Sequence, residues 1–458
     1  MSNKKLINVN QVSQMVDSDF VFGVFGGKTQ KMAVGDFRTH LNDDDKQILN
    51  EIAFSLDINS PGPSDTKVTV GGNLNMRDML FSQRKSVLMD ANGNYCELNP
   101  NDSRYTIDGT YILGSDGLLL SPWNKCDMMI IIPEYYGRVA TITVGSTQRQ
   151  LLYLSPMPLP GGFTIPQQVV GMYKSTLVNS AMRSLPGYVS DNSKTINAFW
   201  DLAQARSKNH GLANMDFRNW LLWYMMGMYG YRDSQGCKTA DGTLVWGVGL
   251  DGTENTTGSS SDGFARQQSI KHGACLSLGI NDGKSEVTDS AGGTCHSVNV
   301  ASFENPWGQR WEMVQGLCSL TGDSAATVYC WRHNWLPTGT PTAASFANVD
   351  YVKLERKLSE GNGTLMNIIS DKKGQGVYMI PKGQANGVNY SDHYWFKPSG
   401  QLWIVGGDSY LFSSCGLACS FSSDAWSSAN ANADVSARLA YYGDTKKVTP
   451  TELRRLVS

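Results

Sequence analysis

Cysteine and histidine are the residues of this chain that could carry nucleophilic, redox or metal chemistry. Nine cysteines occur, and the closest pair, Cys415 and Cys419, is four residues apart, so no CxxC motif is present. The six histidines are scattered, and none belongs to an HExxH motif. We therefore expect reduced thiols that pack as small apolar groups, no catalytic residues, no metal site and no cofactor.

Phosphate and nucleic-acid binding are not supported by the sequence either. The letters GGKT, at 26–29, match the end of a phosphate-binding loop, but that motif needs a glycine at position 22, which is Phe22. No GxSxG nucleophile motif is present. The formal net charge is -2 and nothing resembles a basic arm, so we expect no nucleic-acid partner.

The stretch around which the chain is organised is ENPWGQRWEMVQG, at 304–316. Asn305 and Pro306 initiate a turn, and Trp307 and Trp311 follow at i,i+4 spacing. This pattern predicts a turn in the core, followed by a strand or a short helix. Aromatic side chains of this size bury large apolar areas. We expect one structural core cluster, formed by Trp220, Tyr224, Trp307 and Trp311.

Three segments are expected to support this stretch. The continuous apolar run 127–133 predicts a strand that is buried on both faces. A helix is predicted at 194–209, with Ser193 as its cap. A second helix is predicted at 216–229, and because it is apolar nearly all round, it should be central and buried.

The N-terminal region predicts a hairpin and a short helix. Residues 19–34 alternate and turn at Gly26 and Gly27. Acidic residues then cap a helix that should run from about 46 to about 56. Its apolar residues follow the spacing of a coiled-coil seam, so the helix either trimerises or packs on its own chain. The seam residues are Leu49, Ile52 and Leu56.

Two further regions are predicted from local patterns. Residues 67–76 alternate as a strand with a glycine turn or bulge, and the region to 119 predicts more short strands between NG, DG and SDG turns. Residues 281–293 are polar and predict a loop. A charged tail after 445 predicts a helix that starts at Pro450.

Composition limits the class of protein. Charged residues are 17% of the 458 positions and 47 positions are glycine, which indicates a loop-rich, β-containing globular chain. No apolar segment follows the first five residues, so we expect no signal peptide. The longest apolar run, 128–133, is too short to cross a bilayer, so we expect no membrane insertion and synthesis in a cytoplasm.

Five segments in order resemble a known family. The chain is similar to fibre and tropism proteins of tailed bacteriophages that carry a C-type-lectin-like domain, a fold shared with the formylglycine-generating enzymes. The N-terminal unit also resembles virion attachment modules. The segments are CDMMIIIPEYYGRV (126–139), RSLPG (183–187), a tryptophan-rich helix ending in YRDSQG (231–236), ENPWGQRWEMVQG (304–316) and GG…ARLAYYG (406–443).

The resemblance implies an α+β fold. It consists of a C-type-lectin-like domain, with a twisted antiparallel sheet, two helices and long loop insertions, preceded by small β-rich and short helical fibre modules. The implied units are an attachment module (1–45), a short helix that could form a trimeric coiled coil (46–58), a β-rich fibre region (59–119), the lectin-like domain (120–445) and a C-terminal tail (446–458).

Two activities of this fold are not implied by the residues present. The active cysteines of formylglycine-generating enzymes stand five apart after the Gly-Gly pair, and Leu411 and Gly416 occupy those positions here. Calcium-dependent lectins carry Glu-Pro-Asn or Gln-Pro-Asp with Trp-Asn-Asp, whereas this chain has Glu-Asn-Pro at 304–306 and no Trp-Asn-Asp.

The function implied is that of a virion fibre protein, of head or tail, that binds the host cell surface. Its expected partners are other virion proteins, through the N-terminal module, and a host surface glycan or protein, and its expected assembly is a homotrimer. It is expected on the virion. Two alternatives stay open: a structural capsid-decorating or tail component without a receptor, and an enzyme of the formylglycine-generating type.

The resemblance also implies where the receptor binds. Related tropism proteins build the partner-facing surface from the closing segment, here 408–434, which is rich in serine, asparagine and aromatic residues and poor in aliphatic ones. We expect much of it to be exposed, although Phe412 and Trp426 could instead cover the sheet. The expected receptor-binding residues are Asp408, Tyr410, Phe412, Ser414, Ser420, Asp424 and Trp426, bordered by Trp331 and Trp335.

Overall fold

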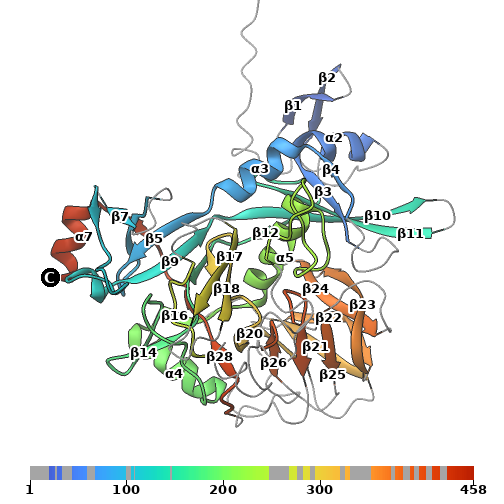
Figure 1. Cartoon of the computed structure of the whole chain (residues 1–458). Helices are drawn as coiled ribbons and strands as arrows, with labels where there is room; N and C mark the ends of the chain where they lie inside the picture. Colours follow the sequence, from blue (N-terminus) through green and yellow to red (C-terminus); the bar gives the residue numbers. More distant parts are fainter. Residues whose placement is uncertain are drawn as a thin grey trace, which may run out of the picture.

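The computed structural model gives a mixed α+β protein that is rich in strands and has few helices (Figure 1). This mixed α+β class agrees with the class expected from the sequence. The residues that it describes are 20–25, 28–33, 44–58, 68–99, 105–107, 109–144, 147–246, 268–275, 282–288, 294–319, 325–330, 352–359, 361–372, 377–384, 392–396, 402–408, 415–422 and 431–458.

A seven-stranded sheet forms the middle layer of the described residues. All of its strand pairs are antiparallel except the parallel pair of β6 and β30. The predicted apolar strand is β9, and all six of its residues are buried, as expected. In spatial order the strands are β16 (His210–Leu212), β29 (Leu439–Tyr441), β13 (Gln168–Gly171), β9 (Asp127–Ile132), β5 (Lys85–Met89), β6 (Asn94–Glu97) and β30 (Lys446–Lys447).

Side chains that alternate along this sheet point into two separate cores. From β9, Met128 and Ile130 enter the larger core, whereas Met129 and Ile131 enter the second core. Helix α5 (Met215–Tyr229) packs in the larger core, and helix α4 (Ile196–Arg206) packs in the second. The two helices therefore cover opposite faces of the sheet.

Helix α5 is buried nearly all round, which confirms its prediction from the sequence. Asn214 caps its start, because its side-chain oxygen accepts a hydrogen bond from the backbone N–H of Phe217 at 3.2 Å. Gly230 ends it in the left-handed conformation, with φ of 72°. Trp220 and Trp223 are fully buried within it.

A nine-stranded sheet contains the organising aromatic stretch. Its strand β20 (Trp311–Ser319) pairs antiparallel with β26 (Leu402–Val405) and parallel with β28 (Val435–Ala437). The predicted turn followed by a strand is therefore confirmed. The other strands are β21 (Ala325–Cys330), β22 (Val352–Ser359), β23 (Gly361–Lys372), β24 (Val377–Gln384), β25 (His393–Phe396) and β27 (Ser420–Ser422).

A five-stranded sheet carries a long hairpin that projects from the body of the molecule (Figure 1). The hairpin consists of β10 (Tyr135–Val144) and β11 (Thr147–Ser155). The remaining strands of this sheet are β12 (Phe163–Ile165), β3 (Phe54–Asp57) and β4 (Val70–Gly72).

Smaller sheets and short helices complete the described residues. The small sheets are β1 (Phe20–Phe25) with β2 (Lys28–Ala33), β7 (Thr106–Ile107) with β8 (Thr110–Tyr111), β14 (Thr176–Val178) with β15 (Ala181–Arg183), and β17 (Gly283–Thr288) with β18 (Thr294–Val300) and β19 (Phe303–Glu304). The short helices are α2 (Asp44–Ile52), α3 (Leu74–Ser82), η2 (Trp123–Lys125) and α7 (Pro450–Val457). The pair β1 and β2 confirms the predicted N-terminal hairpin, and α7 confirms the predicted start at Pro450.

The first short helix ends earlier than predicted. Helix α2 ends at Ile52 because the residues after it form β3, which pairs with β11 and β4. Leu56 therefore lies in a buried strand and not on a helical seam. Leu49 packs against Tyr153 and Leu159 of the same chain, which is the second of the two arrangements that the sequence left open.

Local hydrogen bonding explains three further differences. The strand predicted at 67–76 ends at Gly72, since the Asn73 side chain caps α3 by accepting from Asn75 N–H at 3.0 Å. Thr195, and not Ser193, caps α4. The polar loop predicted at 281–293 contains the whole of the hairpin strand β17, because cross-strand pairing with β18 outweighs its polar composition.

Sheets cross three of the expected domain boundaries, so those boundaries are corrected. Strand β3, from the expected helical unit, pairs with β11, and β5, from the expected fibre region, pairs with β9. Strand β30, from the expected tail, pairs with β6, and α7 places Leu453 and Val457 in the larger core. Strands β3 and β5 thus extend sheets that include strands of the expected lectin-like domain, and β30 extends one of these sheets beyond β6.

The expected single aromatic cluster is divided between the two cores. Trp220, Tyr224 and Trp307 lie in the larger core, with the rings of Trp220 and Tyr224 stacked 5.4 Å apart. Trp311 is also buried, at 5% exposure, but it lies in the second core against Trp395 and Phe421. The reason is that β20 begins at Trp311, so its side chain takes the opposite face of the sheet from Val314.

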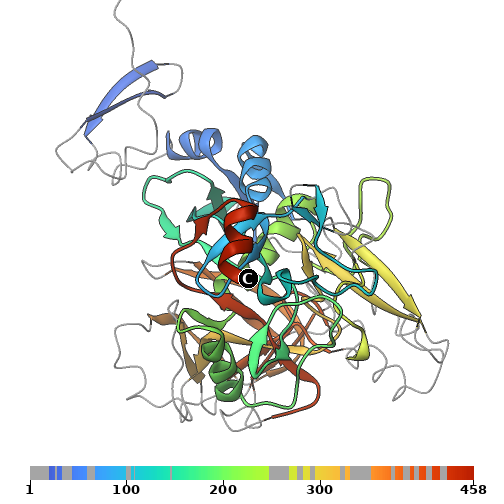
Figure 2. The same ribbon diagram turned by 90° about the vertical axis from the view of Figure 1, so that its left-hand side faces the viewer.

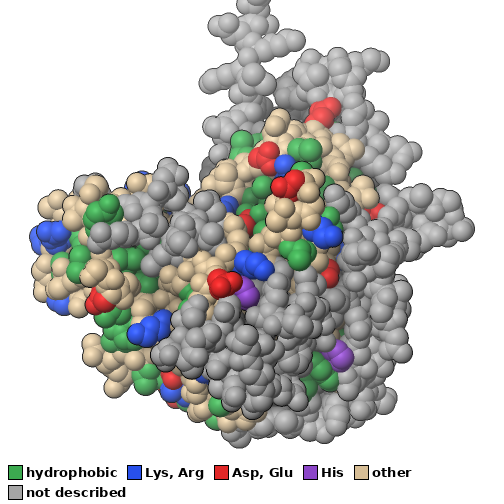
Figure 3. All heavy atoms as spheres, in the orientation of Figure 1, with side chains coloured by type: hydrophobic (Ala, Val, Ile, Leu, Met, Phe, Trp, Pro, Cys, Tyr) green, Lys and Arg blue, Asp and Glu red, His purple; other side chains and the backbone are tan. Residues whose placement is uncertain are grey.

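The surface mixes side chains of every kind. On the face drawn in Figure 3, cationic, acidic and apolar side chains of the described residues are interspersed, and none forms a large continuous patch. Seen from the side in Figure 2, α7 and α4 lie on the viewer's side of the sheets. In the part of the chain that the structure describes, no helix has both the length and the apolar character needed to span a bilayer.

Candidate functional site

Seven of the nine expected receptor-binding residues lie outside the described residues. They are Tyr410, Phe412, Ser414, Asp424, Trp426, Trp331 and Trp335. The other two, Asp408 and Ser420, are buried, at 4% and 6% exposure. Their expected exposure is therefore wrong, because Asp408 closes the tight Gly-Gly turn after β26 and Ser420 begins β27 inside the nine-stranded sheet.

The described residues around the closing segment form a buried charged frame, which consists of Arg218, Glu304, Glu312 and Arg438. At its centre Arg438 Nε donates to Glu312 Oε2 at 3.2 Å, and neither side chain is exposed. The same guanidinium donates to three backbone carbonyls at 2.9–3.1 Å. These carbonyls belong to Gly171, Met172 and Glu304, so one arginine joins β13, β19, β20 and the link before β29.

Glu304 fixes the start of the organising stretch. Its carboxylate accepts hydrogen bonds from the backbone N–H groups of Gly273 and Cys275, at 3.0–3.2 Å. Burial raises the pKa of Glu304 to about 7, against the lowering effect of these donors. The next residue, Asn305, has a positive φ of 50° and accepts from Val298 N–H at 3.0 Å. The turn is thus held on both sides.

Gly406 and Gly407 pack closely against that turn. Gly406 has a φ of 90°, and a Cβ on it would lie 2.7 Å from the carbonyl oxygen of Pro306. Gly308 N–H donates to Gly407 O at 3.2 Å. Arg218 joins the two sides, since it donates to Pro306 O at 2.8 Å and to Leu417 O at 3.2 Å. Only glycine permits this close approach of two backbones.

Acidic and polar side chains accept hydrogen bonds from the backbone in the middle of the closing segment, at 415–422. Asp392 accepts from Ala418 N–H at 2.7 Å, and Ser234 accepts from Leu417 N–H at 3.1 Å. Burial, with the charge of Asp233, raises the pKa of Asp392 well above its ordinary value. A Cβ on Gly416 would lie 2.2 Å from Asp392, so the backbone there sits directly on the carboxyl group.

The far end of the closing segment is fixed by the organising stretch itself. Trp311 N–H donates to Asp434 O at 2.8 Å, and β28 then runs parallel to β20. Described residues therefore anchor the chain at 402–408, 415–422 and 431–437, on either side of two stretches, 409–414 and 423–430. The arrangement can present those stretches from a rigid base.

The described part of the site is not arranged for thiol or metal chemistry. Burial raises the pKa of the Cys415 and Cys419 thiols, which keeps them protonated and poorly nucleophilic. Across the ranges described, all seven cysteines are buried and none forms a disulfide. No group of three His, Cys, Asp or Glu side chains in these ranges could hold a metal ion.

Lys174 is a buried cation that interacts with Glu312, Arg438 and Arg218 of the frame. Its ammonium donates to the carbonyl oxygen of Arg310, and burial lowers the pKa of Lys174 to about 7. Glu312 acts in the opposite direction, and the neighbouring arginines lower the pKa further. Because the side chain is fully buried, it serves packing and hydrogen bonding.

Sequence reasoning missed the residues that build the frame. It named the segments that contain Arg438 and Glu312 but gave neither residue a role, and their separation of 126 positions hides the pair. Arg218 carried a usable signal, since a cation inside a helix that is apolar all round needs a buried partner. Burial lowers the pKa of Arg218 to about 10, and the carbonyl oxygens of Pro306 and Leu417 accept hydrogen bonds from its guanidinium group.

Comparison with known proteins does not supply a function for this site. No model of a known protein family matches the chain, and no curated protein matches it with significant similarity.

Proposed function

We propose that this chain is a bacteriophage virion fibre protein, of head or tail, in which a C-type-lectin-like domain binds a glycan or protein of the host cell surface. It joins other virion proteins through its N-terminal module, acts on the virion and assembles as a homotrimer. The closing segment, 408–434, is its receptor-binding element, and it is not an enzyme.

The observation that carries the proposal is the convergence of the segments that resemble this family. Arg438 of the closing motif bonds to Glu312 and to the backbone of Glu304, and Gly406 lies against Pro306. Arg183 of the RSLPG segment bonds to Asp127 of the apolar strand at 2.7 Å. The organising stretch and the described parts of the closing segment thus meet in one buried scaffold, whereas the RSLPG segment and the apolar strand meet at a separate contact.

A rigid base with short anchored stretches between its strands suits recognition. Loops held on a fixed scaffold bind partners with little loss of entropy, and serine, asparagine, tyrosine and tryptophan are the residues that such loops use. The stretches 409–414 and 423–430 have this composition. The residues that anchor these stretches are, by contrast, glycines and buried charged groups. Such residues can hold the stretches in place but are not exposed to contact a receptor.

The first test concerns the virion. Antibody against the purified chain, followed by gold labelling and electron microscopy of phage particles that encode it, should label a fibre. Deleting residues 1–43 should prevent incorporation and leave the melting temperature near that of the full chain. The deletion stops before α2 because Phe54 and Leu56, which follow it, are fully buried. Unlabelled particles, or normal incorporation of the truncated chain, would refute virion attachment.

The second test concerns the host cell. Purified full-length chain should bind host cells and compete with phage adsorption, and Tyr410→Ala combined with Trp426→Ala should abolish both effects at an unchanged melting temperature. Tyr111→Ala is the matched control, since this aromatic residue is 46% exposed on β8. Labelled particles with no binding of the chain to cells would support the structural component without a receptor.

A further inference from the structure

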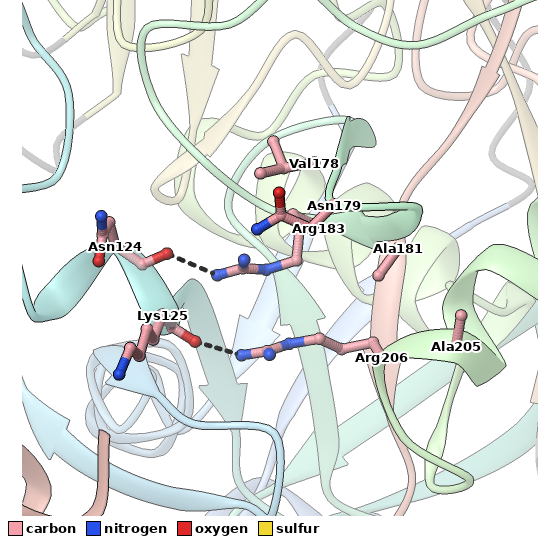
Figure 4. Close-up of a pocket in the computed structure, with 8 residues that line it drawn as sticks. All are labelled: Asn124, Lys125, Val178, Asn179, Ala181, Arg183, Ala205 and Arg206. Atoms are coloured by element: carbon pink, nitrogen blue, oxygen red, sulfur yellow. Dashed lines mark hydrogen bonds between the residues drawn. The ribbon is translucent and has the colours of Figure 1, made fainter. Parts of the chain in front are cut away.

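A pocket of about 480 Å³ lies away from the buried charged frame, between η2, the β14–β15 hairpin and the end of α4 (Figure 4). We call it the arginine pocket. Its volume is in the range of small-molecule sites. The eight residues that line it include three cations and no acid. They are Asn124, Lys125, Val178, Asn179, Ala181, Arg183, Ala205 and Arg206.

Two arginines in the pocket are held side by side by one buried carboxylate. Arg183 Nε donates to Asp127 Oδ1 at 2.7 Å, and Arg206 Nε donates to Asp127 Oδ2 at 2.8 Å. Burial opposes ionisation of Asp127, but the two guanidinium groups outweigh it and lower the pKa of this carboxyl below its ordinary value. Asp127 is thus an anion that both arginines share.

Backbone carbonyls fix the second edge of each guanidinium. Arg183 Nη2 donates to Cys126 O at 2.6 Å. Figure 4 shows the other two bonds, from Arg183 Nη2 to Asn124 O at 3.3 Å and from Arg206 Nη2 to Lys125 O at 2.6 Å. No described atom accepts from Nη1 of either arginine. Since the Arg183 side chain is only 5% exposed and the Arg206 side chain 14%, their rotamers are set before any ligand arrives.

The charge of the pocket is only partly compensated by the described residues around it. Asp127 balances one of the three cations that line the pocket. Lys125 donates to the carbonyl oxygen of the C-terminal residue, Ser458, at 2.7 Å. At least one positive charge is left for a ligand. Asn124 and Asn179 add exposed amides, which can bind hydroxyl groups.

We propose that the arginine pocket binds the carboxylate of an acidic sugar, with the two Nη1 groups donating to it and the amides of Asn124 and Asn179 binding its hydroxyls. A planar carboxylate matches the edge of a guanidinium, and Asp127 already shows one carboxylate shared by these two arginines. A negatively charged ligand would offset positive charge that Asp127 leaves unbalanced. This site is separate from the closing segment, and its occupancy does not depend on the proposed virion function.

The test is calorimetric titration of the full chain with D-glucuronate, D-glucose and inorganic phosphate at low ionic strength. Glucuronate should bind, glucose should not, and phosphate should bind more weakly than glucuronate. Asn179→Asp places a negative charge in the pocket lining and should weaken glucuronate binding about tenfold or more. Asparagine and aspartate both tolerate the positive φ of 53° at this exposed position, so the variant should fold.

Asn75→Asp is the matched control, because it makes the same charge change at an exposed position of α3. It should change glucuronate binding by no more than about twofold, since charges at that distance are screened. Failure of glucuronate to bind, equal binding of glucose, tighter binding of phosphate, or equal effects of the two variants would each overturn the assignment.

Discussion

Two arginine–carboxylate clusters in this molecule share their chemistry but differ in how completely they are enclosed. In the buried charged frame, Arg438 and Glu312 have no exposure, and the guanidinium uses all three nitrogens on described acceptors. In the arginine pocket, Arg183 and Arg206 share Asp127 but keep one nitrogen each for the pocket.

The difference in enclosure indicates that one cluster supports the fold and that the other can bind a ligand. A fully enclosed ion pair repays its desolvation only through complete hydrogen bonding, so it is costly to disturb and has no capacity for a ligand. A cluster that opens onto a pocket keeps donors in place at a smaller desolvation cost. We infer that the frame specifies how the sheets meet, whereas the pocket keeps oriented charge available.

The largest expected effect is the loss of the central cation of the frame. Arg438→Gln leaves the Glu312 carboxylate buried without its charge partner and removes the donors to three carbonyls. We expect a loss of about 3–5 kcal/mol in the free energy of unfolding, measured by urea denaturation. Lys85→Gln, which breaks an exposed pair with Glu97, should cost less than about 1 kcal/mol.

A steric substitution tests how tightly the backbone of Gly406 packs against the turn at Pro306. In Gly406→Ala the new methyl group would meet Pro306 O at 2.7 Å, and the residue would keep a φ of 90°. Backbone strain and overpacking together should cost about 2–4 kcal/mol. Gly117→Ala is the matched control, with φ of 77° and nothing within 4 Å of the new methyl group, and it should cost about 1–2 kcal/mol. Equal losses would show that the contact with Pro306 is unimportant.

The dependence of folding stability on pH provides a third test, through His272, which lies beside the buried charged frame. The Nδ1–H of this ring donates to Leu185 O at 3.2 Å, and the ring stacks on Tyr173. Burial lowers the pKa of His272 to about 3, whereas the unfolded chain should have its ordinary value near 6.5. The unfolded state therefore binds the proton first, and stability from the neutral ring is full above about pH 6.5 and falls as the pH is lowered towards 3.

The measurement compares His272→Asn with the parent chain at pH 7.5 and pH 5. Between these values the stability advantage of the parent should shrink by about 2 kcal/mol, since one pH unit below the unfolded pKa corresponds to about 1.4 kcal/mol. Using the difference between the two chains removes the opposite contribution of Glu304, whose raised pKa of about 7 costs stability as the pH rises. A constant difference would mean that His272 is accessible to protons in the folded state.

Sequence patterns predicted the elements whose composition is extreme. Strand β9 and helix α5 are so apolar that burial on all sides was the only consistent arrangement, and both are confirmed. Patterns failed where a single polar side chain decided the structure. Leu74 and Met76 alternate as in a strand, yet the cap supplied by Asn73 begins a helix there. Strand β17 is polar and is held by its partner.

The two clusters were beyond the reach of local patterns. The arginine pocket combines η2, the β14–β15 hairpin and the last turn of α4, and Asp127 meets Arg206 across 79 positions. Predicting either cluster requires the sheet order, which places β13 between β9 and β29. The segments 126–139, 183–187, 304–316 and 406–443 contain Asp127, Arg183, Glu312 and Arg438, but nothing in their sequence indicates which of these charges are enclosed.

Among the variants within the two clusters, Arg206→Gln has the smallest expected loss of stability, and it is the sharpest test of the comparison. Asp127 would still accept from Arg183 Nε at 2.7 Å and from Ser184 N–H at 2.9 Å, and the Arg206 side chain is already 14% exposed. The loss should therefore be about 1 kcal/mol, well below that of Arg438→Gln, whereas D-glucuronate binding should weaken about tenfold because one of its two guanidinium donors is gone. Urea denaturation and calorimetric titration of the same sample measure both quantities. If Arg206→Gln cost as much stability as Arg438→Gln and left binding intact, the pocket would be a second structural clamp, and the distinction between the two clusters would fail.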